Sequence, residues 1–389
     1  MQTTKSKNKS SPSRARSGSR GHSQSPSPRS RSHSKSRQGS RVGSRNSSVG
    51  SRQSRGSRSF LGGADYGGPV ADGNIRILNS IECGGEIFSL RYTEDGTDVC
   101  VGLLDGSIKV VNPATSQIIN NLSNEETLKE SQPVTCIRTK PGQDNTNIIG
   151  ASYASGIVRT WNHDTGEILS TMKDKGEALC LSFNPHINIL AVGKGNGEIK
   201  LYDEATLKVA SILTKSKNPN LIDGHKNKVF CIVNHPTNPQ EFLSGGWDGD
   251  IHVWDARRPH SVRRFCGPFI AGEGIDIDKK GRELAVACWR GQHQLQVLDY
   301  GSGEVISDIE PERQTFYLSC VQYLGRDHLM AGGTDHSIFR VVDLKKKKTV
   351  ASIRNLGTGI LSVDCQKRGH ISKIAVNGDT QLNILEFNK

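Results

Sequence analysis

The stretch LSGGWDGDIHVWD, which spans Leu243–Asp255, has the pattern of two short strands joined by a tight turn. Small and apolar residues fill LSGG, Asp and Gly follow at the turn, and polar and apolar residues alternate in DIHVWD. The dipeptide Gly224-His225 and a further strand-like run, VFCIVNHP, precede this stretch. The unit therefore predicts at least three consecutive strands, and it contains no helical period.

Related units recur along the chain. They end at Asn112, Asn162, Asp203, Asp255, Asp299, Asp343 and Glu386. Successive ends lie 50, 41, 52, 44, 44 and 43 residues apart, which brackets the roughly 40–45-residue period of a four-stranded propeller blade. The last unit runs out of chain after its third strand, whereas Asn74–Ile81 (NIRILNSI) has strand character ahead of the first unit. We expect this segment to pair with the last blade, because closing the ring removes open sheet edges.

These features resemble the WD40-repeat β-propellers over residues 74–389. The expected fold is an all-β, seven-bladed WD40 β-propeller, closed by an N-terminal strand and preceded by a disordered tail. The resemblance implies a structural hydrogen-bond tetrad in the best-preserved unit, formed by His225, Ser244, Asp248 and Trp254. Residues 224–270 are also similar to a group of eukaryotic WD40 proteins that carry generic names, and this similarity implies no activity.

Residues 1–60 differ from the rest of the chain in charge and texture. They hold 15 of the 51 Lys and Arg residues, none of the 39 Asp and Glu residues, and 21 serines. The formal charge of +12 therefore belongs to this segment, since the remaining residues carry a net charge of −3. With Phe60 as its single aromatic residue, the segment cannot bury enough apolar surface to offset its ordering entropy, which predicts disorder. Residues 61–73 are interpreted as a Gly-rich linker.

The Arg/Ser dipeptides of this basic tail resemble the RS segments of splicing-associated proteins, which implies phosphorylation. The candidate phosphorylation sites are Ser11, Ser25, Ser27, Ser40 and Ser44. Because each phosphate adds about −1.5 to −2 charges, roughly eight of them would cancel the charge of the tail. An unmodified tail would bind nucleic acid without sequence specificity, and a merely solvating role remains the alternative.

The nine cysteines form no C-x-x-C pair. Aligning the first strand of each unit places only small residues at one position: Ser89, Cys136, Cys180, Cys231, Gly274, Cys320 and Ser362. Such residues let neighbouring blades pack closely around the axis, and one cysteine per blade is a poor metal site. The glycine-rich run 193–197 opens onto a strand and lacks the Gly-Lys-Ser/Thr of a phosphate loop. We expect no catalytic residues, no metal and no cofactor.

Large apolar residues recur at two positions that the resemblance places on the upper face of the ring. The first position lies just before the turn between the second and third strands, and it holds Trp247, Leu104 and, allowing for a two-residue insertion, Trp289. The second position lies just before the small first-strand residue, and it holds Phe88, Leu179 and Phe230. Exposed aromatic residues are common anchors of protein interfaces. These six are the candidate partner-binding residues. The alternative is that the phenylalanines pack between blades and the two tryptophans pack on each other.

The functional prediction is a non-enzymatic scaffold for protein–protein contacts, forming a monomeric ring within a larger complex. The first alternative is a ribonucleoprotein-associated RNA-processing factor that uses its tail, and the second is a substrate adaptor of a ubiquitin-ligase or cytoskeletal assembly. No run approaches the ~20 apolar residues that span a bilayer, so we do not expect an integral membrane protein. Nine cysteines without a C-x-x-C pair, in a chain whose N-terminus lacks the apolar region of a secretory signal, predict reduced thiols and an intracellular protein, cytoplasmic or nuclear or both. Lys345–Lys348 (KKKK) is interpreted as a solvated loop, or else as an aid to nuclear import.

Overall fold

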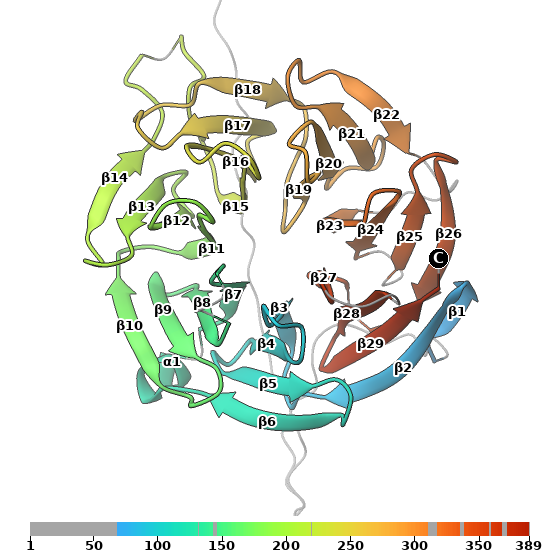
Figure 1. Ribbon diagram of the computed structural model, residues 1–389. Coiled ribbons are helices and arrows are strands. Elements are labelled where there is room, and N and C mark those ends of the chain that lie inside the picture. The colour runs from blue at the N-terminus through green and yellow to red at the C-terminus, as the bar shows by residue number, and fades with distance from the viewer. Residues whose placement is uncertain are drawn as a thin grey trace, which may run out of the picture. The chain divides into compact units, whose positions relative to one another are not determined.

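A computed structural model describes residues 68–388, except 131, 143–145, 219, 310–316, 335–337, 358 and 368–371. In this part of the chain the strands form seven sheets that surround a central channel, so the expected all-β, seven-bladed propeller is confirmed (Figure 1). The basic tail with its five candidate phosphorylation sites, and residues 61–67, lie outside the described residues. The described residues contain one helix, α1 (Glu125–Glu130), and no helix in them is long and apolar enough to cross a membrane.

Each blade is an antiparallel sheet whose first strand lies nearest the channel (Figure 1). Blade one holds β3 (Ile87–Tyr92), β4 (Val99–Leu103), β5 (Ile108–Asn112) and β6 (Gln117–Leu122). Blade two holds β7 (Val134–Thr139), β8 (Ile148–Tyr153), β9 (Ile157–Asn162) and β10 (Ile168–Lys173). Blade three holds β11 (Ala178–Phe183), β12 (Ile189–Lys194), β13 (Ile199–Asp203) and β14 (Val209–Leu213).

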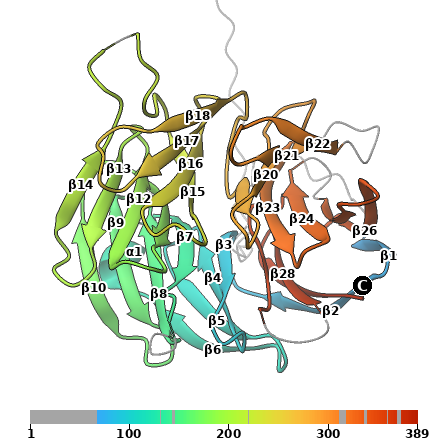
Figure 2. The same ribbon diagram turned by 45° about the horizontal axis from the view of Figure 1, so that its top comes forward.

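The remaining blades repeat this order. Blade four holds β15 (Val229–Asn234), β16 (Glu241–Gly246), β17 (Asp250–Asp255) and β18 (Arg263–Cys266), and the connection that leads into it from β14 projects from the ring (Figure 2). Blade five holds β19 (Ile275–Ile277), β20 (Glu283–Ala287), β21 (Leu295–Asp299) and β22 (Val305–Ile309). Blade six holds β23 (Leu318–Leu324), β24 (His328–Gly333), β25 (Phe339–Asp343) and β26 (Lys348–Arg354).

Blade seven joins the two ends of the propeller. It combines β27 (Val363–Cys365), β28 (Ser372–Gly378) and β29 (Gln381–Phe387) with β2 (Ile75–Glu82). Strand β2 is antiparallel to β29, with Ile75 opposite Phe387 and Glu82 opposite Gln381. The predicted closure by the N-terminal strand is therefore confirmed, and it pairs the edge that β29 would otherwise leave open.

A short strand, β1 (Val70–Gly73), adds a fifth strand to blade six by pairing with β26. These four residues fall within 61–73, the segment that the sequence analysis interpreted as a linker, and here they form a strand. All four are exposed, so the strand forms by backbone pairing and carries no pattern of buried side chains. Gly73 has φ +77°, and a Cβ there would lie 2.2 Å from the carbonyl oxygen of Val350, so the turn into β2 requires glycine.

The core lies between the blades rather than inside any one sheet. One cluster joins Val110 of blade one to Ile149 and Trp161 of blade two, and another joins Leu243 of blade four to Leu284 of blade five. The second strands are buried on both faces, as in β4, whose five residues are all buried, since each blade has a neighbour on each side. This packing holds the seven first strands at fixed positions around the channel.

Candidate functional site

The first strands carry a β-bulge at the residue that precedes the small position. The pairing register of the first with the second strand shifts across this residue in five blades. The bulged residues are Phe88, Thr135, Leu179, Phe230 and Ser319. A bulge inserts an unpaired residue and redirects its side chain. The repeated bulge therefore explains why one position in successive blades turns toward the opening of the channel.

Three of the predicted partner-binding residues meet at this opening, which we call the mouth. Phe88, Leu179 and Phe230 come from blades one, three and four and line a cavity of about 280 Å³. Leu361, which precedes the small residue Ser362 of blade seven, lines it as well. All four side chains belong to half-buried residues, so an apolar cavity stays open to solvent here.

Two more of the predicted residues flank the mouth on turns between second and third strands. Trp247 is 46% exposed, and its ring lies 5.5 Å from that of Phe230. Leu104 is 41% exposed at the corresponding turn of blade one. Gly249, at φ +78°, permits the tight turn that follows Trp247. Trp247 therefore extends the apolar surface of the mouth over blade four.

Trp289 lies in a neighbouring aromatic group with Tyr317 and Phe269, and of these three residues the sequence analysis identified only Trp289. It is half-buried, and its ring lies 5.5 Å from that of Tyr317, which is 38% exposed. Its backbone N–H donates to the carbonyl of Phe269, which is itself 46% exposed and lies against Gly249. The ring partner of Trp289 is thus Tyr317 and that of Trp247 is Phe230, in place of the contact between the two tryptophans that was the alternative.

The four residues of the expected tetrad are joined by hydrogen bonds in blade four. The Nδ1–H of His225 donates to Asp248 at 2.9 Å, and its Nε2 accepts from the Ser244 hydroxyl at 2.6 Å. The indole N–H of Trp254 donates to the same Ser244 oxygen at 2.7 Å. This network fastens the connection before blade four to the turn beside Trp247, so it positions one wall of the mouth.

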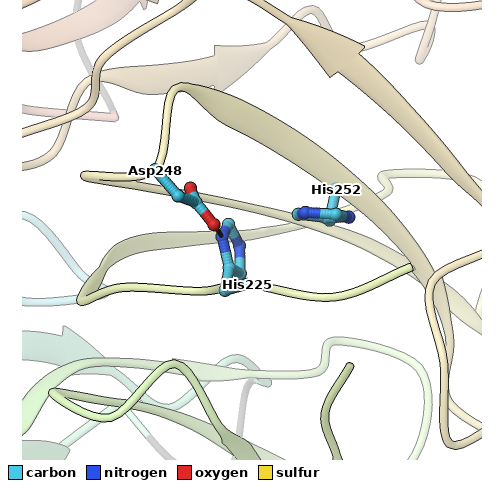
Figure 3. Close-up of side chains that lie close together, drawn as sticks. All are labelled: His225, Asp248 and His252. Carbon is cyan, nitrogen blue, oxygen red and sulfur yellow. Dashed lines mark hydrogen bonds and ion pairs between the residues drawn. The ribbon is translucent and has the colours of Figure 1, made fainter. Parts of the chain in front are cut away.

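A group of three potential metal ligands includes part of this network. His225, Asp248 and His252 place one ligand atom each within 4.8 Å of one another (Figure 3). Both ring nitrogens of His225 are already hydrogen-bonded, and Asp248 also accepts from the Lys226 backbone N–H at 2.8 Å. Burial lowers the pKa of His252 to about 3, which keeps its ring neutral. The ligand atoms of His225 and Asp248 are thus held by hydrogen bonds, and among the three residues only Nε2 of His252 lacks a partner in the described part of the chain. One unoccupied ligand atom does not make a metal site.

Below the mouth, a cluster of charged side chains crosses the channel. Glu273 accepts from Arg91 at 2.8 Å and from Arg138 at 2.6 Å, and Arg91 also lies 3.4 Å from Asp364. Glu273 lines both the mouth cavity and a second cavity of about 280 Å³ that Arg91 and Arg138 also line. The cluster, which we call the channel ion pairs, therefore forms the floor of the mouth.

The channel ion pairs were not predicted from the sequence. Burial raises the pKa of Glu273, but the guanidinium groups of Arg138 and Arg91 outweigh this effect and hold the pKa below its ordinary value. The sequence nevertheless contains a pattern that could have identified three of these residues. Arg91, Arg138 and Asp364 each lie two residues after the small first-strand residue of their blade. Four charges from four blades thus share the channel.

The small first-strand residues lie where the sequence analysis expected them, between blades. Cys136, Cys180, Cys231 and Cys320 are each 1% exposed, and Ser89 and Ser362 are equally buried. Burial raises the pKa of the Cys136 and Cys180 thiols, so they stay protonated and unreactive. All nine cysteines are free thiols. Their arrangement is that of packing residues.

Comparison with known proteins gives relatives over parts of the chain. A family model described as WDR54 matches residues 82–274, which include blades one to four. Human WD repeat-containing protein 54 is 28% identical over 181 residues, which are 45% of this chain and 50% of the human protein. Ribosome biogenesis protein YTM1 of Ajellomyces capsulatus is 27% identical over 142 residues, which are 34% of this chain and 28% of that protein.

A more distant relative matches a longer segment. The periodic tryptophan protein 2 homolog of Dictyostelium discoideum is 22% identical over 210 residues, 53% of this chain and 21% of that protein. The chain spans half or less of the length of each of these curated relatives. Each of these proteins is therefore similar to the chain over only part of its own length.

Proposed function

Because the chain belongs to the WD40-repeat β-propeller proteins, we propose that it is a non-enzymatic scaffold that binds other proteins at the mouth of its channel. The ring supplies a rigid platform, since its core lies between blades and its last sheet is closed by β2. Scaffolds of this kind act by presenting surfaces in fixed relative positions. No covalent step is required of any residue.

The observation that carries this proposal is the apolar character of the mouth. Phe88, Leu179, Phe230 and Leu361 line a solvent-open cavity, and Trp247 continues the surface outward. An exposed apolar patch with aromatic side chains in its centre is typical of protein interfaces. The floor below it is polar, but Glu273 is already paired with two arginines. The mouth therefore suits a partner segment that inserts an apolar side chain.

The test is affinity capture of the full chain from native extract, with and without RNase. Wild type is compared with a mouth variant, Phe88→Ala/Phe230→Ala, and with a control variant, Ile119→Ala/Leu169→Ala. The control residues are exposed apolar residues of the outer strands β6 and β10. The expected result is a set of proteins that survives RNase, persists in the control and is lost from the mouth variant. Equal capture by all three proteins would contradict the proposal.

A second candidate function is that of a ribonucleoprotein-associated factor. Two observations favour it: the relatives named for ribosome biogenesis, and the 15 basic residues of the tail. On this proposal the protein works in the nucleus, and phosphorylation of the tail reduces its attraction to RNA. A captured set that disappears with RNase and ignores the mouth variant would favour this candidate. Co-purifying ligase subunits would instead favour a substrate adaptor.

A further inference from the structure

A groove between blades five and six carries features that the scaffold function does not use. It lies at the end of the sheets away from the mouth, because it is lined by the turns that follow the first strands β19 and β23. The turn between β25 and β26 completes it, and Val297, Ile306 and Ser307 of the outer strands of blade five form a wall. Its volume is about 610 Å³. We call it the blade 5–6 groove.

Cationic side chains from both blades surround this groove. They are Lys279, Lys280 and Arg282 of blade five, and Arg326, Lys345 and Lys347 of blade six. All six residues are exposed. The KKKK run, interpreted from the sequence as a solvated loop or an aid to nuclear import, thus contributes Lys345 and Lys347 to one bank of the groove, and the basic turn at 279–282 forms the other. Two basic turns meet only because blades five and six are neighbours (Figure 1).

The acidic residues of the groove do not neutralise these charges. Asp278 accepts the backbone N–H groups of Lys280, Arg282 and Glu283, so its carboxylate shapes the turn. Asp327 pairs with Lys345 at 3.0 Å. Together with Glu283, the three carboxylates oppose six cations, and the groove keeps a positive charge.

Two hydroxyl groups line the groove without a hydrogen-bond partner in the part of the chain that the structure describes. They are the phenol of Tyr323 and the hydroxyl of Ser307, and both oxygen atoms are buried. Burial raises the pKa of Tyr323, so its hydroxyl keeps a proton to donate. Buried polar groups in folded proteins are nearly always satisfied. Two unpartnered hydroxyl groups beside a cationic groove are groups that an anionic ligand can satisfy by accepting from them.

We propose that the blade 5–6 groove binds the phosphate backbone of a single-stranded nucleic acid. Four of its six cations are lysines on flexible stems, spread over two blades, which suits a series of phosphates. A single phosphoserine would favour a compact set of arginine forks. The exposed Ile306 adds an apolar wall on which a base can rest. The residues that line this site belong neither to the basic tail nor to the mouth.

The test measures binding of a fluorescent single-stranded RNA 12-mer to the full, unphosphorylated chain over a series of salt concentrations. The groove variant is Lys280→Glu/Lys347→Glu, with one substitution on each bank. The control variant, Lys215→Glu/Lys217→Glu, makes the same charge change at two exposed lysines on the connection between blades three and four. The tail is identical in all three proteins, so its contribution cancels in the comparison.

The groove variant is expected to bind at least about tenfold more weakly, with a salt slope reduced by about 1.4, since each phosphate contact on a single strand contributes about 0.7. The control variant is expected to lose less than about twofold. Tyr323→Phe, which removes only the hydroxyl, is expected to weaken binding about threefold to tenfold without changing the salt slope.

Four outcomes would overturn the proposal. Equal losses in the groove and control variants would mean that the tail and the net charge account for binding. Unchanged binding in the groove variant would exclude the groove. Tight binding of a phosphoserine peptide that depends on Lys280 and Lys347, with no such dependence for RNA, would make the ligand a phosphoprotein instead. Competition by inorganic phosphate alone at millimolar concentration would likewise indicate a single-phosphate site.

Discussion

The first strands present two different surfaces to the channel within three residues of each other. Phe88 lines the open apolar mouth, whereas Arg91, on the same strand, belongs to the buried channel ion pairs. The mouth residues are half-buried, so their substitution is expected to affect stability little. The channel ion pairs, in contrast, join blades one, two, five and seven. The comparison separates a position that we expect to determine stability, Arg91, from an adjacent position that we propose binds partners, Phe88.

The largest effect on stability is expected from breaking the channel ion pairs. Glu273→Gln removes the shared negative charge and one of the two acceptor oxygens and leaves Arg138 buried without its counter-charge, which is expected to lower the free energy of unfolding by about 3 kcal/mol. Chemical denaturation measures this loss. The matched control is Glu304→Gln on the exposed turn before β22, which is expected to change the free energy of unfolding by less than about 0.5 kcal/mol. Equal losses in the two variants would refute the structural role of the cluster.

The pH dependence of stability sharpens the same comparison. The pKa of Glu273 is held below its ordinary value in the folded protein, so its stabilising contribution is present above that ordinary value and is lost as the pH falls through the folded value. The stability difference between wild type and Glu273→Gln is therefore expected to be full at about pH 7 and to shrink below about pH 4. Denaturation curves at about pH 7 and at several pH values from about 4 down to about 2 measure this shrinkage.

Other titrating groups cancel in that difference. Burial raises the pKa of Asp276 to about 6, and this carboxyl group therefore destabilises the fold as the pH rises, opposite in sign to Glu273. Asp276 is present in both proteins. A difference between wild type and variant that stays constant from about pH 7 down to about pH 2 would contradict the assigned role of Glu273.

The smallest effect on stability is expected at the mouth. Phe88→Ala/Phe230→Ala removes half-exposed rings and is expected to cost about 1 kcal/mol of stability. Thermal denaturation measures this cost, and the same variant is expected to lose captured proteins. A loss of stability as large as that of Glu273→Gln would show that the rings belong to the core, which would undo the distinction between the two surfaces.

The ring itself could be predicted from the sequence because its signals are local and repeat. Turn residues such as Asp248-Gly249 recur with a regular spacing, and the shortage of a fourth strand at the end of the chain pointed to the segment that became β2. The mouth residues could be predicted for the same reason. A bulge at one position of a repeated strand places Phe88, Leu179 and Phe230 alike.

Features that depend on distant segments could not be predicted in this way. The pairing of Arg91 with Glu273 joins residues 182 apart and requires the ring to close first. The blade 5–6 groove likewise requires two turns from different blades to meet. Strand β1 forms by backbone hydrogen bonding, which leaves no apolar pattern. Phe269 and Tyr317 escaped notice because they lie in connections outside the repeated positions.

The most direct test of the scaffold role places a photo-crosslinking amino acid at Phe230, inside the mouth, and separately at Ile119, on the exposed outer strand β6. Both proteins are irradiated in cells and treated with RNase before the crosslinked species are separated. The account predicts discrete protein adducts from position 230 that survive RNase and are missing from position 119. Adducts of equal yield at both positions, or none at position 230, would contradict it.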